Sequence, residues 1–92
     1  MKEIFLIFKT IETADGRFLQ HFPADFKETR KEAYEILRDN VRPSLQRQFK
    51  EVKVKRFDPY ALIAEVTDHL GTKALFTYSI TSVKNRPFIE IH

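Results

Sequence analysis

Residues 25–41, DFKETRKEAYEILRDNV, carry the clearest helical pattern in the chain and decide its fold class. Asp25 is followed three residues later by Glu28, which fits the N-cap and N3 positions of a capping box. The apolar residues recur at three- and four-residue spacing: Ala33, Tyr34, Leu37 and Val41. Because this spacing places them on one side of a helix, the segment predicts an amphipathic helix that begins at Asp25 and packs on a core.

The same apolar stripe continues past Pro43, through Leu45 to Phe49. A proline inside a helix removes one backbone hydrogen bond and clashes with the preceding turn. Two arrangements are open: the helix kinks at Pro43, or a second short helix begins with Pro43 in its first turn, which we favour. In both arrangements a single apolar stripe faces the sheet.

The chain before the helix predicts a β-hairpin. Residues 2–11, KEIFLIFKTI, are apolar on both sides of an extended strand, which is typical of a strand covered on both faces. Asp15 and Gly16 form a turn dipeptide, and residues 17–22, RFLQHF, read as the returning strand. Pro23 then ends the hairpin.

The chain after the helix contains up to four segments with strand character: residues 51–57, 60–67, 73–83 and 87–92. Their connections are short, and short connections favour antiparallel neighbours. We therefore predict one α+β domain over residues 1–92, with the order ββ-α(α)-ββββ. It would contain a single mainly antiparallel sheet of about five or six strands, with one helix or a helix pair packed on one face.

Length and composition agree with one small globular domain, because the chain has 92 residues, 42% hydrophobic and 32% charged. The chain has no cysteine, which excludes disulfides and thiolate chemistry. Its longest apolar run near the start, residues 4–8, is shorter than the ~7–15 residues of a signal-peptide core, and no run approaches the ~18 residues of a membrane span. We expect a soluble cytoplasmic protein with no membrane contact.

No residue pattern points to catalysis. The three histidines, His21, His69 and His92, have no partner at a metal-ligand spacing, and no serine lies in a nucleophile elbow. Only two glycines are present, so no glycine-rich loop can hold a phosphate. Asp68 beside His69 reads as turn chemistry. We expect no enzyme activity, no cofactor and no metal.

The positive charge is concentrated in one segment. The net charge is +3, yet residues 38–56 hold seven basic residues against two acidic ones. The candidate polyanion-binding residues are Arg42, Arg47, Lys50, Lys53, Lys55 and Arg56, and the aromatic residues that could stack on bases are Phe57, Tyr60 and Tyr78. A different interpretation is that the lysines of residues 51–57 protect an edge strand from pairing with other chains.

Several predicted strands are apolar on both faces, although one helical region can cover only one face of a sheet. The candidate protein-interaction residues are Phe5, Ile7, Ile63 and Phe76. Either these side chains bind a partner, or the sheet curls and closes on itself. The leading hypothesis is a small non-catalytic interaction module that binds a protein partner or itself through an apolar sheet face. The alternative is a nucleic-acid-binding domain that uses the basic segment.

Overall fold

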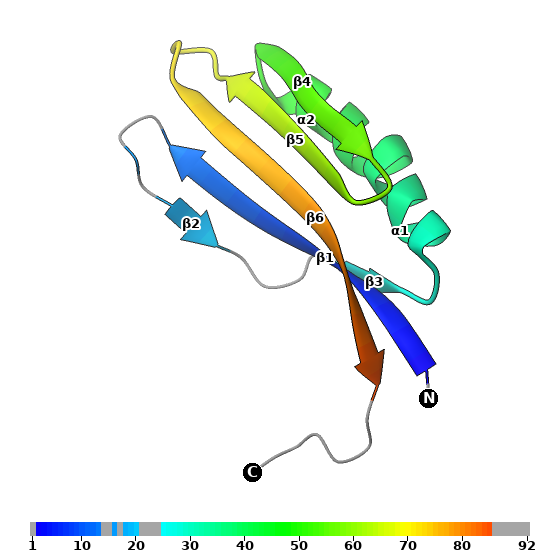
Figure 1. Cartoon of the computed structure of the whole chain (residues 1–92). Coiled ribbons are helices and arrows are strands. Elements are labelled where there is room, and N and C mark those ends of the chain that lie inside the picture. Colours follow the sequence, from blue (N-terminus) through cyan, green and yellow to red (C-terminus); the bar gives the residue numbers. More distant parts are fainter. Residues whose placement is uncertain (1, 14–15, 17, 21–24, 86–92) are drawn as a thin grey trace.

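The computed structural model describes residues 2–13, 16, 18–20 and 25–85, which form one antiparallel sheet with a helix on one face (Figure 1). The strands, in chain order, are β1 (Lys2–Thr13), β2 (Phe18–Gln20), β3 (Asp25–Lys27), β4 (Glu51–Asp58), β5 (Ala61–Thr67) and β6 (Lys73–Asn85). They lie in the order β2-β1-β6-β5-β4, and β3 also pairs with β1. The expected α+β class with a single antiparallel sheet is confirmed.

Four of the strands are long, and β2 and β3 have three residues each. The number of long strands is therefore slightly lower than the five or six expected. The hairpin of β1 and β2 is confirmed, and β3 pairs further along the same edge of β1, opposite residues 5–7. Residues 87–92, expected to form a last strand, lie outside the described residues.

The helix begins later than the sequence pattern indicates. Its N-cap is Thr29, whose hydroxyl accepts a hydrogen bond from the Glu32 backbone N–H at 3.1 Å and also lies 3.1 Å from a Glu32 carboxylate oxygen. The capping-box prediction at Asp25 is wrong, because Asp25 lies in β3 and pairs with Ile7 of β1. The Thr-x-x-Glu pattern four residues later begins the helix instead.

The helical segment then runs without a break through three parts: α1 (Arg30–Ile36), η1 (Leu37–Val41) and α2 (Arg42–Gln48). In the wider turn η1, the Arg42 backbone N–H donates to the Leu37 carbonyl, five residues back. Pro43 lies in the first turn of α2, as favoured, but no break separates the two helices. The wider turn offers a physical way to accommodate Pro43, which has no N–H and needs room for its ring.

The helix and one sheet face enclose the core. Because side chains alternate along a strand, Leu62, Ala64 and Val66 of β5 face the helix and are buried, while Ile63 points to the other side. The other fully or nearly buried side chains of the core cluster are Ile7, Ala33, Leu37, Leu45, Phe76, Tyr78 and Ile80. Fully burying one such large side chain contributes about 1.5–3 kcal/mol. Tyr34 stacks on Phe57 at 5.1 Å between ring centroids, which joins the helix to β4.

Strand β4 forms an edge of the sheet, because in the described part of the chain it pairs only with β5. Its register shifts in the middle: Val54 pairs with Ala64, whereas Arg56 pairs with Ile63, which leaves Lys55 as an extra residue. A bulge and exposed lysines both hinder another strand from pairing with an edge. The edge position of β4, expected from its lysines, is therefore observed.

Candidate interaction face

The side of the sheet away from the helix carries a group of partly exposed apolar side chains. We call it the open face and define it by six side chains: Ile4, Leu6 and Phe8 of β1, Ile63 of β5, and Leu75 and Val83 of β6. No helix of the described residues lies on this side, and Figure 1 looks onto it with the helix behind the sheet. Val83 is 39% exposed and the other five are partly exposed.

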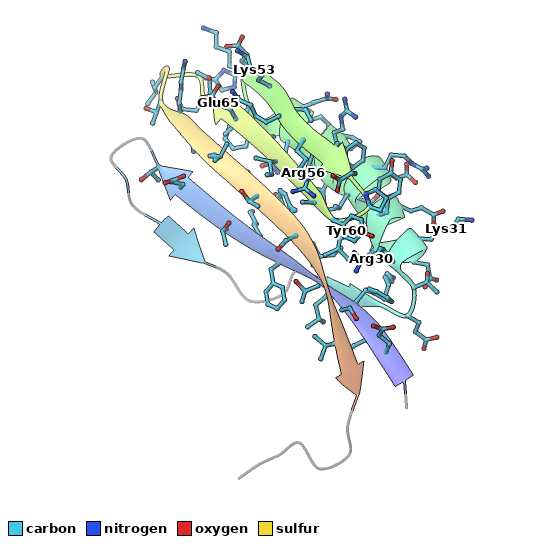
Figure 2. The ribbon with its side chains drawn as sticks, viewed as in Figure 1. Arg30, Lys31, Lys53, Arg56, Tyr60 and Glu65 are labelled. Atoms are coloured by element: carbon cyan, nitrogen blue, oxygen red, sulfur yellow. The ribbon has the colours of Figure 1, made fainter. Side chains whose placement is uncertain are left out.

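The antiparallel registers place these side chains in rows across the sheet. Ile4 lies opposite Val83, Leu6 opposite Thr81, and Phe8 opposite Ser79. At the other end the face is charged: one row contains Lys53, Glu65, Leu75 and Glu12 on adjacent strands, and Lys53 and Glu65 are labelled in Figure 2. A shallow hollow of about 170 Å³ lies here, lined in part by Glu12, Glu65 and Lys73. The open face is thus apolar at one end and charged at the other.

Three of the four residues that the sequence assigned to an interaction face lie on the helix side instead. Ile7 is fully buried and Phe76 is 7% exposed, both in the core. Phe5 packs against that core, and its ring centroid lies 5.0 Å from the Arg30 guanidinium. Ile63 alone belongs to the open face. The residues missing from the sequence assignment are mainly those at even positions of β1: Ile4, Leu6 and Phe8.

The sequence did contain a signal for part of this correction. The helix-facing positions of β6 read Ala74, Phe76, Tyr78, Ile80, whereas the alternate positions of the strand include Thr77, Ser79 and Thr81. This alternation distinguishes the core side of β6 from its solvent side. Strand β1 offers no such signal, because both of its sides are apolar.

The six candidate polyanion-binding residues lie around the β4 edge and do not share one face. Arg42 reaches β4 from the helix layer, with its guanidinium 5.3 Å from the Phe57 ring centroid. Lys53 and Arg56 lie on the open face, and Lys55 is the bulge residue. Arg47 and Lys50 are exposed at the end of α2 and in the turn that follows it. Arg56 is held by Asp58 at 2.7 Å.

Two of the three aromatic residues expected to stack on bases are covered by other parts of the protein. Phe57 stacks on Tyr34, and Tyr78 is only 5% exposed. Burial raises the pKa of Tyr78 to about 12. Tyr60 is 57% exposed, but the Arg30 guanidinium lies 4.4 Å from its ring centroid.

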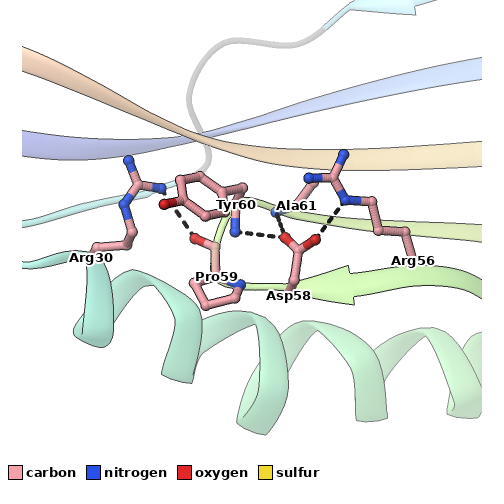
Figure 3. Close-up of polar contacts among 6 residues, drawn as sticks. All are labelled: Arg30, Arg56, Asp58, Pro59, Tyr60 and Ala61. Carbon is pink, nitrogen blue, oxygen red and sulfur yellow. Dashed lines mark hydrogen bonds and ion pairs between the residues drawn. The ribbon is translucent and has the colours of Figure 1, made fainter.

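The turn between β4 and β5 explains how Arg30 and Tyr60 are held (Figure 3). One Asp58 carboxylate oxygen accepts hydrogen bonds from the backbone N–H groups of Tyr60 and Ala61, at 2.8 and 3.0 Å. The other accepts from Arg56, and Arg30 donates to the Pro59 carbonyl at 3.1 Å. Arg56, followed by the Tyr60 and Ala61 amides, holds the pKa of Asp58 below its usual value. This cluster ties the helix to the hairpin and is a structural element of the fold.

The polar groups elsewhere in the described residues lie in turns and in shallow hollows beside the helix. Asp68 accepts hydrogen bonds from the backbone N–H groups of Leu70 and Thr72, both at 2.9 Å, so it organises the β5–β6 turn as expected. Lys9 lines a hollow of about 210 Å³ beside the helix, next to Ser44 and Tyr78. Within residues 2–13, 16, 18–20 and 25–85, no three His, Cys, Asp or Glu side chains come close enough to hold a metal ion. No helix in this part of the chain is long and apolar enough to cross a membrane.

Neither protein-family models, curated proteins nor solved structures match this chain. Its own residues are therefore the basis for the function proposed below.

Proposed function

We propose that the protein is a small non-catalytic interaction module that binds a protein partner through the open face of its sheet. The supporting observation is the row of large apolar side chains at Ile4, Leu6 and Phe8, continued by Val83 on the neighbouring strand. Contiguous apolar surface on a soluble domain usually marks an interaction site, because exposing it to water is unfavourable.

The shape of the sheet supports the same proposal. In the described residues, β4 pairs only with β5, and β2 and β3 pair only with β1, so the two edges do not meet. Among the strands that the structure describes, the two edges of the sheet are therefore not paired with each other, which supports an open second face. The helical segment, residues 30–48, packs against the opposite side.

A matched pair of variants tests this proposal. Val83→Lys places a charge on the open face at a position that is already 39% exposed, so the fold should survive. Leu70→Lys makes the same kind of change at a 91% exposed aliphatic residue in the β5–β6 turn, outside the open face. Circular dichroism and urea unfolding establish that both variants fold.

The readouts are binding of a hydrophobic fluorescent dye, self-association by analytical ultracentrifugation, and affinity for any partner purified with the wild-type protein. Val83→Lys should reduce all of the binding that the wild type shows, whereas Leu70→Lys should leave it unchanged. A wild-type protein that binds neither dye, partner nor itself would contradict the proposal. Loss of binding in Leu70→Lys alone would move the site to the turn.

Nucleic-acid binding is a second candidate function, supported by the line of basic side chains along the β4 edge. Arg42 extends from the helix to Phe57, and Lys53, Lys55 and Arg56 follow on β4 itself. Lys and Arg side chains neutralise phosphates and release counterions, so binding would weaken steeply with salt. The occupied aromatic rings make this candidate the weaker one, because Phe57 and Tyr78 are covered.

A double charge reversal separates the two interpretations of the β4 lysines. Lys53→Glu with Lys55→Glu should abolish salt-dependent retention on single-stranded or duplex nucleic acid if this edge binds phosphates. Lys27→Glu with Lys31→Glu changes the net charge equally, away from β4 and the open face, and serves as the control. Equal retention of both double variants would exclude a role for the β4 edge in binding, and aggregation of the first variant alone would support edge protection.

A further inference from the structure

From the layout of the open face, we infer that its partner is a second copy of this chain, packed face to face about a two-fold axis. The axis would run parallel to the strands, between β1 and β6. This inference rests on the proposed function and adds the identity and orientation of the partner. Three properties of the face support it: the sizes of its side chains, the positions of its charges, and its area.

Side-chain size is the first argument. On the open face, β1 carries the large residues Ile4, Leu6 and Phe8, while their neighbours on β6 are Val83, Thr81 and Ser79. A two-fold axis between these strands places β1 of one copy over β6 of the other, and the reverse. Each large side chain then faces a smaller one, and large-to-small alternation lets two layers interdigitate at about 10 Å between sheets.

The positions of the charges favour an axis along the strands over an axis that lies in the same plane but runs across them. The axis along the strands keeps the charged end of one copy over the charged end of the other. It brings Glu12 on β1 close to Lys73 on β6 of the second copy, because Lys73 lies one same-face step from Leu75, the register partner of Glu12. An axis that lies in the interface plane but runs across the strands would instead stack β1 on β1 in the reverse direction and bury Glu12 against the apolar end around Ile4. Burial of an unpaired charge against an apolar surface is costly.

Glu12, Glu65 and Lys73 are available for such contacts. Among the described residues, none of the three forms an ion pair within its own chain. They line the hollow of about 170 Å³ at the charged end, which a side chain of the second copy can enter.

The area of the face is sufficient for a specific interface of modest size. The β1–β6 ladder has 12 paired residues, so it is about 40 Å long at about 3.3 Å per residue. With β5 added, the flat projected area is about 500 Å² per copy, or about 1,000 Å² in total, which reaches the lower limit for a biological interface. We therefore expect a dimer that dissociates on dilution.

The main test replaces one small residue on the face. Thr81→Lys adds a charge at an exposed position opposite Leu6, without removing any core side chain. Thr72→Lys makes the identical substitution in the β5–β6 turn, at an exposed position outside the interface. Sedimentation velocity over a series of protein concentrations should show a dimer for the wild type and Thr72→Lys. For Thr81→Lys, the dissociation constant should rise by at least about tenfold.

A second experiment tests the orientation and remains informative if Thr81→Lys fails to fold. Because the chain has no cysteine, a single introduced cysteine reports on one position only. Ser79→Cys lies beside the proposed axis, so a short bis-maleimide should link two copies efficiently. Glu51→Cys on the distant edge strand β4 should give little linkage. Efficient linkage at position 51 and none at position 79 would overturn the proposed axis.

The outcomes separate this inference from the function on which it rests. A wild type that remains monomeric at every concentration, but whose dye and partner binding is lost in Val83→Lys, overturns the homodimer and leaves the interaction face intact. A dimer that Thr81→Lys does not weaken overturns the use of this face by the second copy. Absence of any binding that depends on Val83 overturns both.

Discussion

At the scale of single residues, the polar contacts that matter most secure the turn between β4 and β5. Asp58 accepts two backbone hydrogen bonds and one from Arg56, and Arg30 from the helix reaches the next carbonyl along. These bonds satisfy turn amides that lie at the end of the strand ladder. They also hold the β4–β5 hairpin against the start of the helix.

Replacing Asp58 should destabilise the protein in a pH-dependent way. The pKa of Asp58 is lowered in the folded state, chiefly by Arg56, so its stabilising contribution is present above its ordinary pKa of about 3.9. That contribution is lost as the pH falls through the lowered value. Asp58→Asn should therefore unfold at a lower urea concentration than the wild type at neutral pH, and the difference should shrink below about pH 4.

The control for this prediction is Asp39→Asn. Asp39 is also paired with an arginine, Arg38, at 2.8 Å, and its pKa is likewise lowered, but no described backbone N–H group donates to it. Exposed ion pairs alone contribute little to stability. A loss of stability in Asp39→Asn as large as that in Asp58→Asn would contradict the role given to the negative charge of Asp58, which strengthens the bonds from Arg56 and the turn amides.

At the scale of elements, the start of the helix depends on Thr29. The sequence pattern predicted a cap at Asp25 with Glu28, whereas the structure has its cap at Thr29, three residues before Glu32. Strand pairing of residues 25–27 with β1 decided between them, because those backbone groups bond to the sheet. The wider turn at η1 then carries the helix past Pro43 with its apolar stripe intact.

Removing this cap should weaken the protein by about 1 kcal/mol. Thr29→Ala leaves the Glu32 backbone N–H without the Thr29 hydroxyl that accepts its bond. The matched control is Thr72→Ala, because the Thr72 bond to Asp68 uses its backbone N–H and survives the substitution. Urea unfolding monitored by circular dichroism gives both values, and equal losses would contradict the assignment of Thr29 as the cap.

At the scale of the whole molecule, stability comes from the layer between the helix and the sheet. Leu37 lies at the centre of this layer and is fully buried. Leu37→Ala should cost about 2–5 kcal/mol, since it leaves a cavity between helix and sheet. Leu70→Ala removes the same atoms from a 91% exposed residue and should change the free energy of unfolding by less than about 0.5 kcal/mol.

Calorimetry or urea unfolding compares the two leucine variants directly. The expected large difference between Leu37→Ala and Leu70→Ala would confirm that the helix–sheet layer carries the core. A small loss of unfolding free energy in Leu37→Ala would contradict this, because it would mean that packing of the helix on the sheet contributes little to stability.

Local chemistry in the sequence was sufficient for the fold class. Apolar spacing identified the helix, Asp15–Gly16 marked the first hairpin, and the lysines of residues 51–57 marked an edge strand. These signals act over a few residues, so they are readable without knowledge of the rest of the chain. The same holds for Asp68, whose short side chain bonds the backbone of its own turn.

The open face required long-range information. Both sides of β1 are apolar, and nothing local distinguishes Leu6 from Ile7. The pairing of Ile7 with Ile80 and of Leu6 with Thr81, set by residues more than seventy positions apart, placed one in the core and the other outside. A strand register shifted by one residue would exchange the two sides, because side chains alternate with a period of two. Sequence therefore determined that one face of this sheet would lack a helix, and the tertiary pairing determined which side chains lie on it.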